Sequence, residues 1–426
     1  MPTHQATITI SAAVRADAVE SLRATLDEIG RDPGGNATLP FGQIDGLHFA
    51  RLVLLDASTD LKGNLLAPRL LFLLDCDAPG NRRLADIVRR AKGGIDRVFE
   101  HCERYPAAGD RTGRARFDYL QAHVCATDVS YVNTVGRPLS QIREEANLRA
   151  AIEEFLDEPE HDWSRATAME VREKVRDFVG ERPELAPMLR RAPRASIAWR
   201  AGEAWHAVRS LLLVLALTPI GLLVAPFYAV LLRWHEKRDP APRIIPDPAH
   251  VERLAAAEDH LAQNQFTAVG LLKPGRFRLY TAIVVLWGVN FGTRHIYNRG
   301  ALTGVRSIHA ARWVFLDKRR RLAFASNYDG SLENYMDDFI DKVAWGLNAV
   351  FSNGMEYPRT NWLVRDGAKD ELAFKSYIRV RQQPSQVWYS AYGDLTTVNI
   401  ANNARLRAGL SGRMNDDEAA AWLRLL

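Results

Sequence analysis

The sequence contains few cysteines: Cys76, Cys102 and Cys125 are the only ones among 426 residues. Three cysteines are too few for a disulfide framework, and their spacing is not that of metal ligands. We therefore expect them to be small buried hydrophobic side chains in a reducing compartment. The N-terminal stretch lacks both a basic start and a continuous apolar run, which predicts no signal peptide and a first half that begins in the cytoplasm.

Motifs that identify common enzyme classes are also missing. The sequence has no P-loop, GxSxG, HExxH, paired CxxC or convincing GxGxxG motif, which argues against nucleotide hydrolysis, triad hydrolysis and zinc chemistry. The formal net charge of +5 is modest for this length, and no repeat of basic and aromatic residues is present. We therefore expect no nucleic-acid partner. The composition leaves the oligomeric state open.

Charge is absent from one long stretch, residues 211–232, which lies between the two halves of the chain. These 22 residues are enough to cross about 30 Å of hydrocarbon. The basic flanks favour contact with anionic lipid head groups, and tryptophans near both ends are typical of membrane interfaces. The flanking residues are Arg190, Arg191, Arg194, Arg200, Arg209, Arg233, Lys237, Arg238 and Arg243, with Trp199, Trp205 and Trp234. Membrane lipids are therefore expected partners.

Three interpretations of this stretch remain open: a single transmembrane helix, a segment that enters and leaves on one side, and a buried core helix. Pro219-Ile220-Gly221 lies near its middle, where it can break a helix. Both flanks are basic, whereas a single crossing usually has one richer side. We expect a monotopic or re-entrant anchor at the cytoplasmic face of the cell membrane, because this topology keeps both halves in one compartment.

Hydrophobic periodicity in the first half predicts the order β-α-β-β-α-(α)-β, which is that of a ferredoxin-like unit. The expected strands are 5–14, 46–56, 69–75 and 129–135, and the expected helices end near residues 30, 103 and 126. In the second half we expect a first strand at 265–272 and a first helix at about 277–298. The apolar run 279–292 in that helix is too short to span a bilayer, so it predicts a buried or interfacial helix.

The second half repeats the first. Residues 69–106 align with 321–358 at a constant offset of 252, with ten of 38 positions identical. The preceding strand matches at an offset of 261, and the nine-residue difference is an insertion around residues 57–67. The pairs at 261 include His48 with His309 and Arg51 with Arg312, and later positions match at an offset of 258, as Tyr131 does with Tyr389. Identities that keep their order and register indicate duplication.

The duplicated pattern resembles the dimeric α+β-barrel superfamily, which includes dye-decolorising peroxidases and chlorite dismutase-like proteins. The resemblance implies an α+β fold in which two ferredoxin-like repeats form an intrachain pseudo-dimeric α+β barrel, with a central apolar membrane-anchoring helical segment. The expected parts are repeat one (1–150), a charged helical linker (151–208), the apolar segment (209–235), a Pro-rich linker with a helix (236–261), repeat two (262–412) and a C-terminal helix (413–426).

Candidate catalytic residues lie in the second repeat. Asn327, Tyr328 and Asp329 end its third expected strand, just before a helix. A group of Asn, Asp and Ser residues at this place is first of all a helix cap. The resemblance implies another role, because dye-decolorising peroxidases carry a GxxDG stretch whose Asp acts beside the haem. The matching residues here are SNYDG, without the first Gly, and they make Asp329 a candidate catalytic residue.

His309 and Arg312 lie on the preceding strand, whose two faces are both apolar. Their spacing predicts that they point to opposite faces. A buried arginine needs an anionic or carbonyl partner, and one hypothesis is an internal salt bridge of Arg312 with Asp338. The alternative is binding of a carboxylate, a haem propionate or a peroxide. His309 is either a structural histidine or a ligand of haem or a metal.

Residues 386–403 are rich in aromatic and amide side chains. The candidates for substrate binding are Trp388, Tyr389, Tyr392 and Asn399, together with Asn327 and Tyr328. Aromatic walls with a few polar groups suit an apolar ligand, whereas strand-edge packing and turn caps are the structural alternative. The first repeat has plainer residues at these positions, so we expect one pocket, lined by repeat two.

These observations predict a membrane-associated oxidoreductase, peroxidase-like and dependent on haem, that acts on a hydrophobic or lipid-derived small molecule. The redox part follows from a resemblance of fold, which does not determine function. The competing hypothesis is a non-catalytic lipid-binding or scaffolding protein at the membrane surface. If the functional site lies in repeat two, we expect Arg312→Ala to harm function or stability more than Arg51→Ala.

Overall fold

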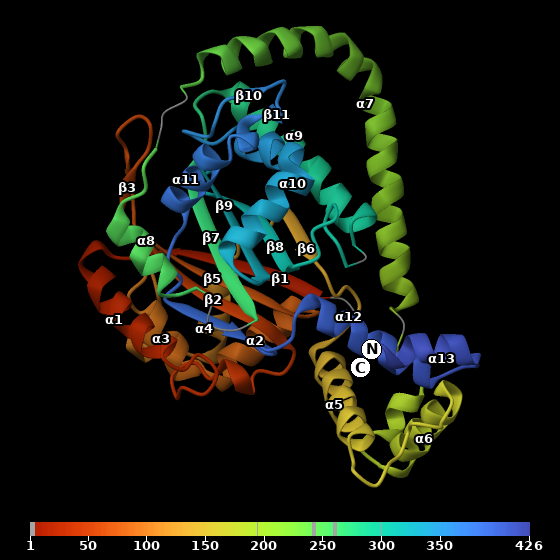
Figure 1. Ribbon diagram of the computed structural model, residues 1–426. Coiled ribbons are helices and arrows are strands. Elements are labelled where there is room, and N and C mark those ends of the chain that lie inside the picture. The colour runs from red at the N-terminus through yellow and green to blue at the C-terminus, as the bar shows by residue number, and fades with distance from the viewer. Residues whose placement is uncertain (1–4, 194, 241–243, 259–261, 299) are drawn as a thin grey trace.

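Two open, four-stranded antiparallel sheets form the centre of the protein in the computed structural model, which describes residues 5–193, 195–240, 244–258, 262–298 and 300–426 (Figure 1). The first sheet has the order β1-β5-β2-β12, and the second has the order β6-β8-β9-β7. The strands are β1 (Gln5–Ala13), β2 (Leu47–Leu55), β5 (Arg69–Asp77), β6 (Val129–Val132), β7 (Gln263–Leu271), β8 (Ile308–Leu316), β9 (Arg321–Asp329) and β12 (Val387–Ser390). The protein is therefore a mixed α and β structure.

The two halves exchange their closing strands. β6 ends the first half but pairs with β8 of the second, and β12 ends the second half but pairs with β2 of the first. A self-contained ferredoxin-like unit would keep its closing strand in its own sheet. The expected order of elements is present in both halves, but neither half completes a four-stranded sheet by itself.

Helices cover the outer faces of the sheets (Figure 1). The helices of the described residues are α1 (Val19–Gly30), α2 (Gly80–Arg90), α3 (Lys92–Phe99), α4 (Gly113–Ala122), α5 (Leu139–Leu156), α6 (Ala168–Glu181), α7 (Ile197–Arg238), α8 (Pro248–Ala255), α9 (Arg276–Phe291), α10 (Leu332–Phe351), α11 (Glu371–Arg381), α12 (Thr397–Leu410) and α13 (Asp416–Leu423). The insertion expected around residues 57–67 forms the small hairpin β3 (Ser58–Thr59) and β4 (Leu65–Leu66), and a second hairpin consists of β10 (Thr360–Asn361) and β11 (Arg365–Asp366).

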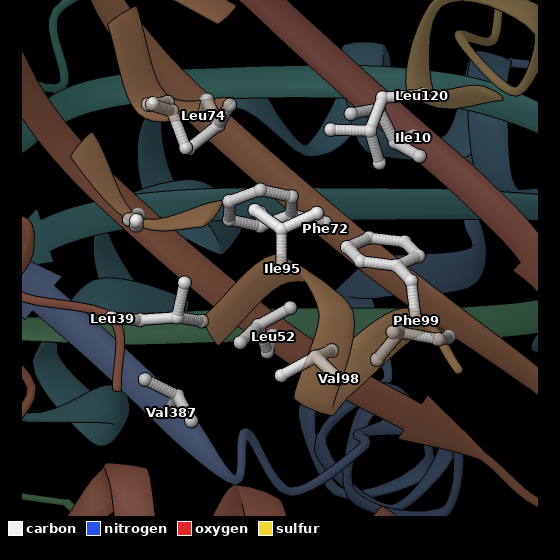
Figure 2. Packing of buried hydrophobic residues seen from close by; sticks show 14 of the residues in the cluster. Ile10, Leu39, Leu52, Phe72, Leu74, Ile95, Val98, Phe99, Leu120 and Val387 are labelled. Carbon is white, nitrogen blue, oxygen red and sulfur yellow. The ribbon is translucent and has the colours of Figure 1, made fainter. Parts of the chain in front are cut away.

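Each sheet is buried on both faces, which explains why its strands are apolar without strict alternation. All nine residues of β2 are buried. The outer face of the first sheet packs against α1 to α4, and Val387 of the exchanged strand β12 lies in this core beside Leu52 (Figure 2). Between the sheets an apolar cluster includes Val53 and Leu73 of one sheet and Val314 of the other.

A separate helical cluster joins the ends of the two halves. α5 and α6 pack against α12 and α13 around Leu148, Val175, Leu406 and Trp422. The segment expected to be a linker between residues 151 and 208 therefore carries a helix, α6, that is part of a folded core. This cluster lies beside the sheets at the lower right of Figure 1.

α7 contains the apolar stretch and arches over the second half (Figure 1). Its residues 211–227 are all exposed, and Pro219 and Pro226 lie inside the helix, where proline causes bending. Within the part of the chain that the structure describes, α7 is the one helix long and apolar enough to cross a membrane, and only 6% of its most apolar window is buried in the protein.

Both ends of α7 are held by the second half. Near the start, Glu203 accepts hydrogen bonds from Arg294 at 2.5 and 2.6 Å. At the end, Asp239 accepts a hydrogen bond from Lys273 at 2.7 Å and pairs with Arg278. Arg278 lies in the first turn of α9 and Arg294 just after its end, so the apolar part of α7 leaves the protein near one end of α9 and returns near the other.

Candidate functional site

Two arginines cross the space between the sheets in opposite directions. Arg312 of β8 forms an ion pair with Asp75 of β5 at 2.5 Å and donates to two backbone carbonyls of the first sheet. Arg51 of β2 donates to Asn327 Oδ1 of β9 at 2.5 Å and to two backbone carbonyls of the second sheet. Each arginine therefore ties its own sheet to the strands of the other half.

The predicted internal salt bridge of Arg312 is confirmed, but the predicted partner is wrong. Asp338 lies on α10 and pairs with Lys342 one helical turn away. Arg51 has no such carboxylate, because the second half has Asn327 where the first has Asp75. Burial, together with the charge of the neighbouring Arg312, lowers the pKa of Arg51 to about 9.

The space around these arginines is almost filled. The cavity between the sheets at this point has a volume of about 10 Å³, which is room for about one water molecule. Apolar side chains occupy the neighbouring part of the interface. Arg312, His309 and Asp329 all have partners within the protein. These residues therefore do not fit a haem at this place, and we assign no chemical step to one there.

His309 and Asp329 hold the first turn of α12. His309 Nε2 lies 2.6 Å from Asp329 Oδ1. Asp329 Oδ2 accepts hydrogen bonds from the backbone N–H and the hydroxyl of Thr397, both at 2.8 Å. A carboxylate at the start of a helix satisfies an unpaired N–H group and interacts favourably with the helix dipole. His309 and Asp329 therefore both have a structural role.

The first half contains the same arrangement. His48 Nε2 lies 3.0 Å from Asp77 Oδ1, and Asp77 accepts the backbone N–H of Leu139 in α5 at 3.3 Å. His48, Asp77 and Leu139 correspond to His309, Asp329 and Thr397 at the offsets of the sequence repeat. The same His–Asp pair therefore holds the start of a helix in each half.

Both histidines are the extra residue of a β-bulge. The register of β8 with β9 shifts between Ile308 and Ala310, and that of β2 with β5 shifts between the residues flanking His48. A bulge re-aims side chains, and the His309 ring lies 5.7 Å from the ring of Phe49 in the opposite sheet. His309 and Arg312 thus point to the same side, so the prediction of opposite faces is wrong.

In the described part of the chain, the six residues expected to bind substrate lie in several different places and have different partners. Trp388 donates to Asn327 Oδ1 at 3.0 Å, and Tyr392 Oη lies 3.0 Å from His48 Nδ1. The other three lie elsewhere: Tyr328 stacks on Tyr335, Tyr389 packs against Phe41 in the first core, and Asn399 completes the capping box of α12. Asn327 thus accepts hydrogen bonds from both Trp388 and Arg51.

An apolar cavity lies on the outer face of the second sheet, between α9 and α10. Its volume is about 260 Å³. Two irregularities contribute to its wall, the π-helical turn η5 (Gly292–Ile296) and a break in α10 at Val343, and such turns are frequent at functional sites. Apolar lining residues include Val285, Val289, Leu302, Trp313, Phe339 and Val350. The apolar run on α9 is visible in the sequence, but the cavity is not.

A loop fills the equivalent place in the first half. Gly94 corresponds to Gly346, and a Cβ atom at Gly94 would overlap the backbone carbonyl of Thr38. Leu39 and Phe41 of the same loop are buried in the first core. Gly346 contacts no such loop, since a Cβ atom there would meet only the side chain of Val343, at 3.1 Å. The equivalent place is therefore open in the second half and filled by a loop in the first.

Exposed apolar side chains continue outward from the cavity. Trp345, which lines it, is 51% exposed. On α9, Tyr280, Val284 and Trp287 are exposed on one stripe, while Val285 and Val289 of the same helix face the cavity. α9 is thus half core and half surface. A contiguous exposed apolar surface marks contact with a ligand, a partner or a membrane.

Comparison with known proteins does not assign the site. No protein-family model matches the chain, and no curated protein matches it. Within the described ranges, no group of three or more His, Cys, Asp or Glu side chains is placed to hold a metal ion. The function is therefore inferred from the geometry of the site.

Proposed function

We propose that this protein binds a hydrophobic, lipid-derived small molecule in the cavity between α9 and α10 while α7 holds it at a membrane surface. One observation carries the proposal: an almost wholly apolar cavity of about 260 Å³ adjoins the exposed apolar stripe of α9. Cavities for small molecules are concave and lined mainly by apolar and aromatic side chains. The exposed stripe gives a lipid a short apolar path from the bilayer to the cavity.

The contacts at both ends of α7 support a one-sided anchor. Carrying one end across a bilayer would break either the pair of Glu203 with Arg294 or the buried contacts of Asp239 with Lys273 and Arg278. Separating a buried ion pair is costly because it leaves an uncompensated charge. We therefore favour a monotopic helix, bent near Pro219 and Pro226, and we place it at the cytoplasmic face because both flanks are basic.

The exchange of closing strands supports an intrachain pseudo-dimer. Arg51 and Arg312 occupy equivalent positions in the sequence repeat, and each contacts a strand of the other half. We interpret the fold as two ferredoxin-like repeats that form a pseudo-dimeric α+β barrel. In this interpretation the barrel is a rigid support, and the second repeat carries the ligand cavity and the membrane contact.

Filling the cavity tests the proposal. Gly288→Leu adds a side chain to the cavity wall at a position where a Cβ atom meets nothing within 4 Å. Gly93→Leu is a matched control, because Gly93 is a helical, exposed glycine of α3 with nothing within 4 Å. Full-length wild type and both variants are purified in a mild detergent, and bound lipid is extracted and quantified by mass spectrometry.

We expect wild type and Gly93→Leu to retain a hydrophobic molecule in constant proportion to the protein, and Gly288→Leu to retain several-fold less. Equal retention by all three proteins would show that this cavity does not bind the molecule. The oxidoreductase hypothesis remains a prediction. A Soret absorption band in the purified full-length protein would support it, whereas colourless, metal-free protein would remove the haem.

A further inference from the structure

Two histidines meet where the start of α7 reaches the second half. Nδ1 of His206 on α7 lies 2.8 Å from Nε2 of His295 on η5, which is hydrogen-bond distance. The centroids of the two rings are 5.0 Å apart. The contact therefore joins the beginning of the apolar helix to the turn that follows α9.

A groove of about 750 Å³ lies at the same place, between the start of α7 and η5. Its wall includes Glu203 of α7 and Arg294 and His295 of η5. The ion pair of Glu203 with Arg294, at 2.5 Å, also crosses from α7 to η5. Side chains of both elements line the groove, so the position of α7 here depends on contacts between these side chains.

The number of protons on the two imidazoles decides whether their contact can form. A hydrogen bond between two ring nitrogens needs one N–H donor and one free lone pair. Two neutral rings meet this requirement, and so does a neutral ring beside a protonated one. Two protonated rings turn N–H groups and like charges toward each other, which breaks the hydrogen bond.

The surrounding charges do not compensate a second positive ring. Among the described residues, Glu203 is the carboxylate that acts on both imidazoles, and it is already paired with Arg294. Arg209 adds positive charge beside His206, Arg200 lines the groove, and β6, which packs on η5, has no charged side chain. Burial, together with the Arg294 cation, holds the pKa of both imidazoles below the ordinary value of about 6.5.

The direction of the pH dependence follows from this lowered pKa. Imidazoles that are free of the contact take up protons near pH 6.5, whereas the paired imidazoles take up both protons only at lower pH. The contact is therefore fully favoured above about pH 6.5, and it is lost as the pH falls through the lower pKa of the paired rings.

We infer that His206 and His295 form a proton-operated latch: the start of α7 is docked on η5 while the pair carries at most one proton, and it is released when both rings are protonated. This inference goes beyond the proposed function, because the docking of α7 can be measured without any ligand. η5 also supplies Gly292 and Thr293 to the wall of the apolar cavity, so acidification acts on an element of that wall.

The test measures the distance between α7 and the body of the protein at two pH values. Ala204→Cys on α7 and Asp341→Cys on α10 lie at exposed positions, and both are spin-labelled in the full-length Cys125→Ser protein in lipid vesicles. Double electron–electron resonance should give one distance at about pH 8, and a second, displaced population should grow several-fold by about pH 5. The same distance distribution at both pH values would overturn the latch.

Two variants identify the imidazoles responsible. His295→Gln keeps a neutral side chain that can hydrogen-bond to His206 but cannot take up the second proton, so the distance should no longer respond to pH. His235→Gln is the matched control, because His235 lies at the other end of α7 and stacks on Phe277, and the response should stay as in wild type. A response that persists in His295→Gln, or that disappears in His235→Gln, would assign the pH dependence to other groups and overturn the latch.

A titration of the unlabelled wild type does not depend on the spin labels. ¹³C-labelled histidine spectra are assigned by the signals that are missing in His206→Gln and His295→Gln. The pair should take up its second proton well below pH 6.5, since two interacting rings titrate in separate steps. Titration of both rings near pH 6.5 would show that docking does not oppose their protonation, which would refute the latch. None of these outcomes depends on a bound lipid, so the proposed function is tested separately.

Discussion

Arg312 of β8 and Asp75 of β5 form an ion pair at 2.5 Å across the space between the two sheets. The reciprocal contact joins Arg51 to the neutral amide of Asn327. A second layer repeats this relationship between α5 and α12, where Arg407 pairs with Glu145 and Arg149 contacts Asn403. In both layers the first half supplies the acid and the second half the amide, so the two halves are equivalent in fold but not in charge.

The two buried arginines should differ in their contribution to stability. Arg312→Met leaves the Asp75 carboxylate buried without its cation, and we expect a loss of about 3–5 kcal/mol in the free energy of unfolding. Arg51→Met removes a buried cation that lacks its own carboxylate and should cost clearly less. Urea unfolding of both full-length variants in one detergent measures the difference. Equal losses would mean that the ion pair with Asp75 does not make Arg312 contribute more to stability than Arg51.

The His–Asp pairs should behave as matched structural clamps. Asp77→Ala and Asp329→Ala each remove the acceptor for a histidine and for the first N–H groups of α5 or α12. We expect both to lower the free energy of unfolding by about 1–3 kcal/mol, with faster proteolysis of the helical cluster that α5 and α12 share. If Asp329→Ala abolished a measurable activity without loss of stability while Asp77→Ala was silent, Asp329 would have the chemical role that the resemblance implied.

Two equivalent glycines distinguish the plugged half from the open one. Gly94→Ala forces a Cβ atom onto the carbonyl of Thr38, whereas Gly346→Ala meets only the side chain of Val343 at the cavity wall. We expect Gly94→Ala to cost about 1–3 kcal/mol through overpacking and Gly346→Ala to be close to neutral. Thermal unfolding midpoints of the two variants provide the comparison. A larger loss for Gly346→Ala would contradict an open cavity beside that residue.

The topology of α7 can be mapped with cysteines placed on either side of it. Glu184→Cys and Glu252→Cys lie at exposed positions before and after α7, and Cys125→Ser removes the one native cysteine that is not fully buried. With a one-sided anchor, a membrane-impermeant maleimide should label both sites to the same extent in sealed, right-side-out or inverted vesicles. Labelling of one site in each orientation would establish a single crossing and would separate the two halves.

Several features of the protein were predictable from the sequence alone. The 22-residue apolar stretch, the order of strands and helices in each half, the insertion at 57–67 and the buried state of Arg312 all depend on hydrophobic periodicity or on the internal repeat. The helix-cap alternative for Asp329 named the wrong helix, because Ser331 caps the following helix α10, whereas Asp329 accepts the N–H of Thr397 at the start of α12.

Other features depended on contacts between distant segments. Asp338 was a plausible partner for Arg312 in sequence, but the arginine reaches into the other half, to Asp75. The β-bulges at His48 and His309 shift the alternation of side chains by one residue, and no periodicity in the sequence marks them. The cavity was not predictable because Gly94 and Gly346 are identical in sequence, and only the loop that covers one of them distinguishes the two halves.

The sequence by itself indicated two similar α and β halves with one long apolar stretch between them, because hydrophobic period and repetition can be read from the order of residues. Only the tertiary structure decided which strand closes each sheet, which carboxylate meets each arginine and which half keeps an open cavity. A short apolar strand carries the information to pair with a sheet edge but not the identity of that edge. That choice depends on the packing of both halves together.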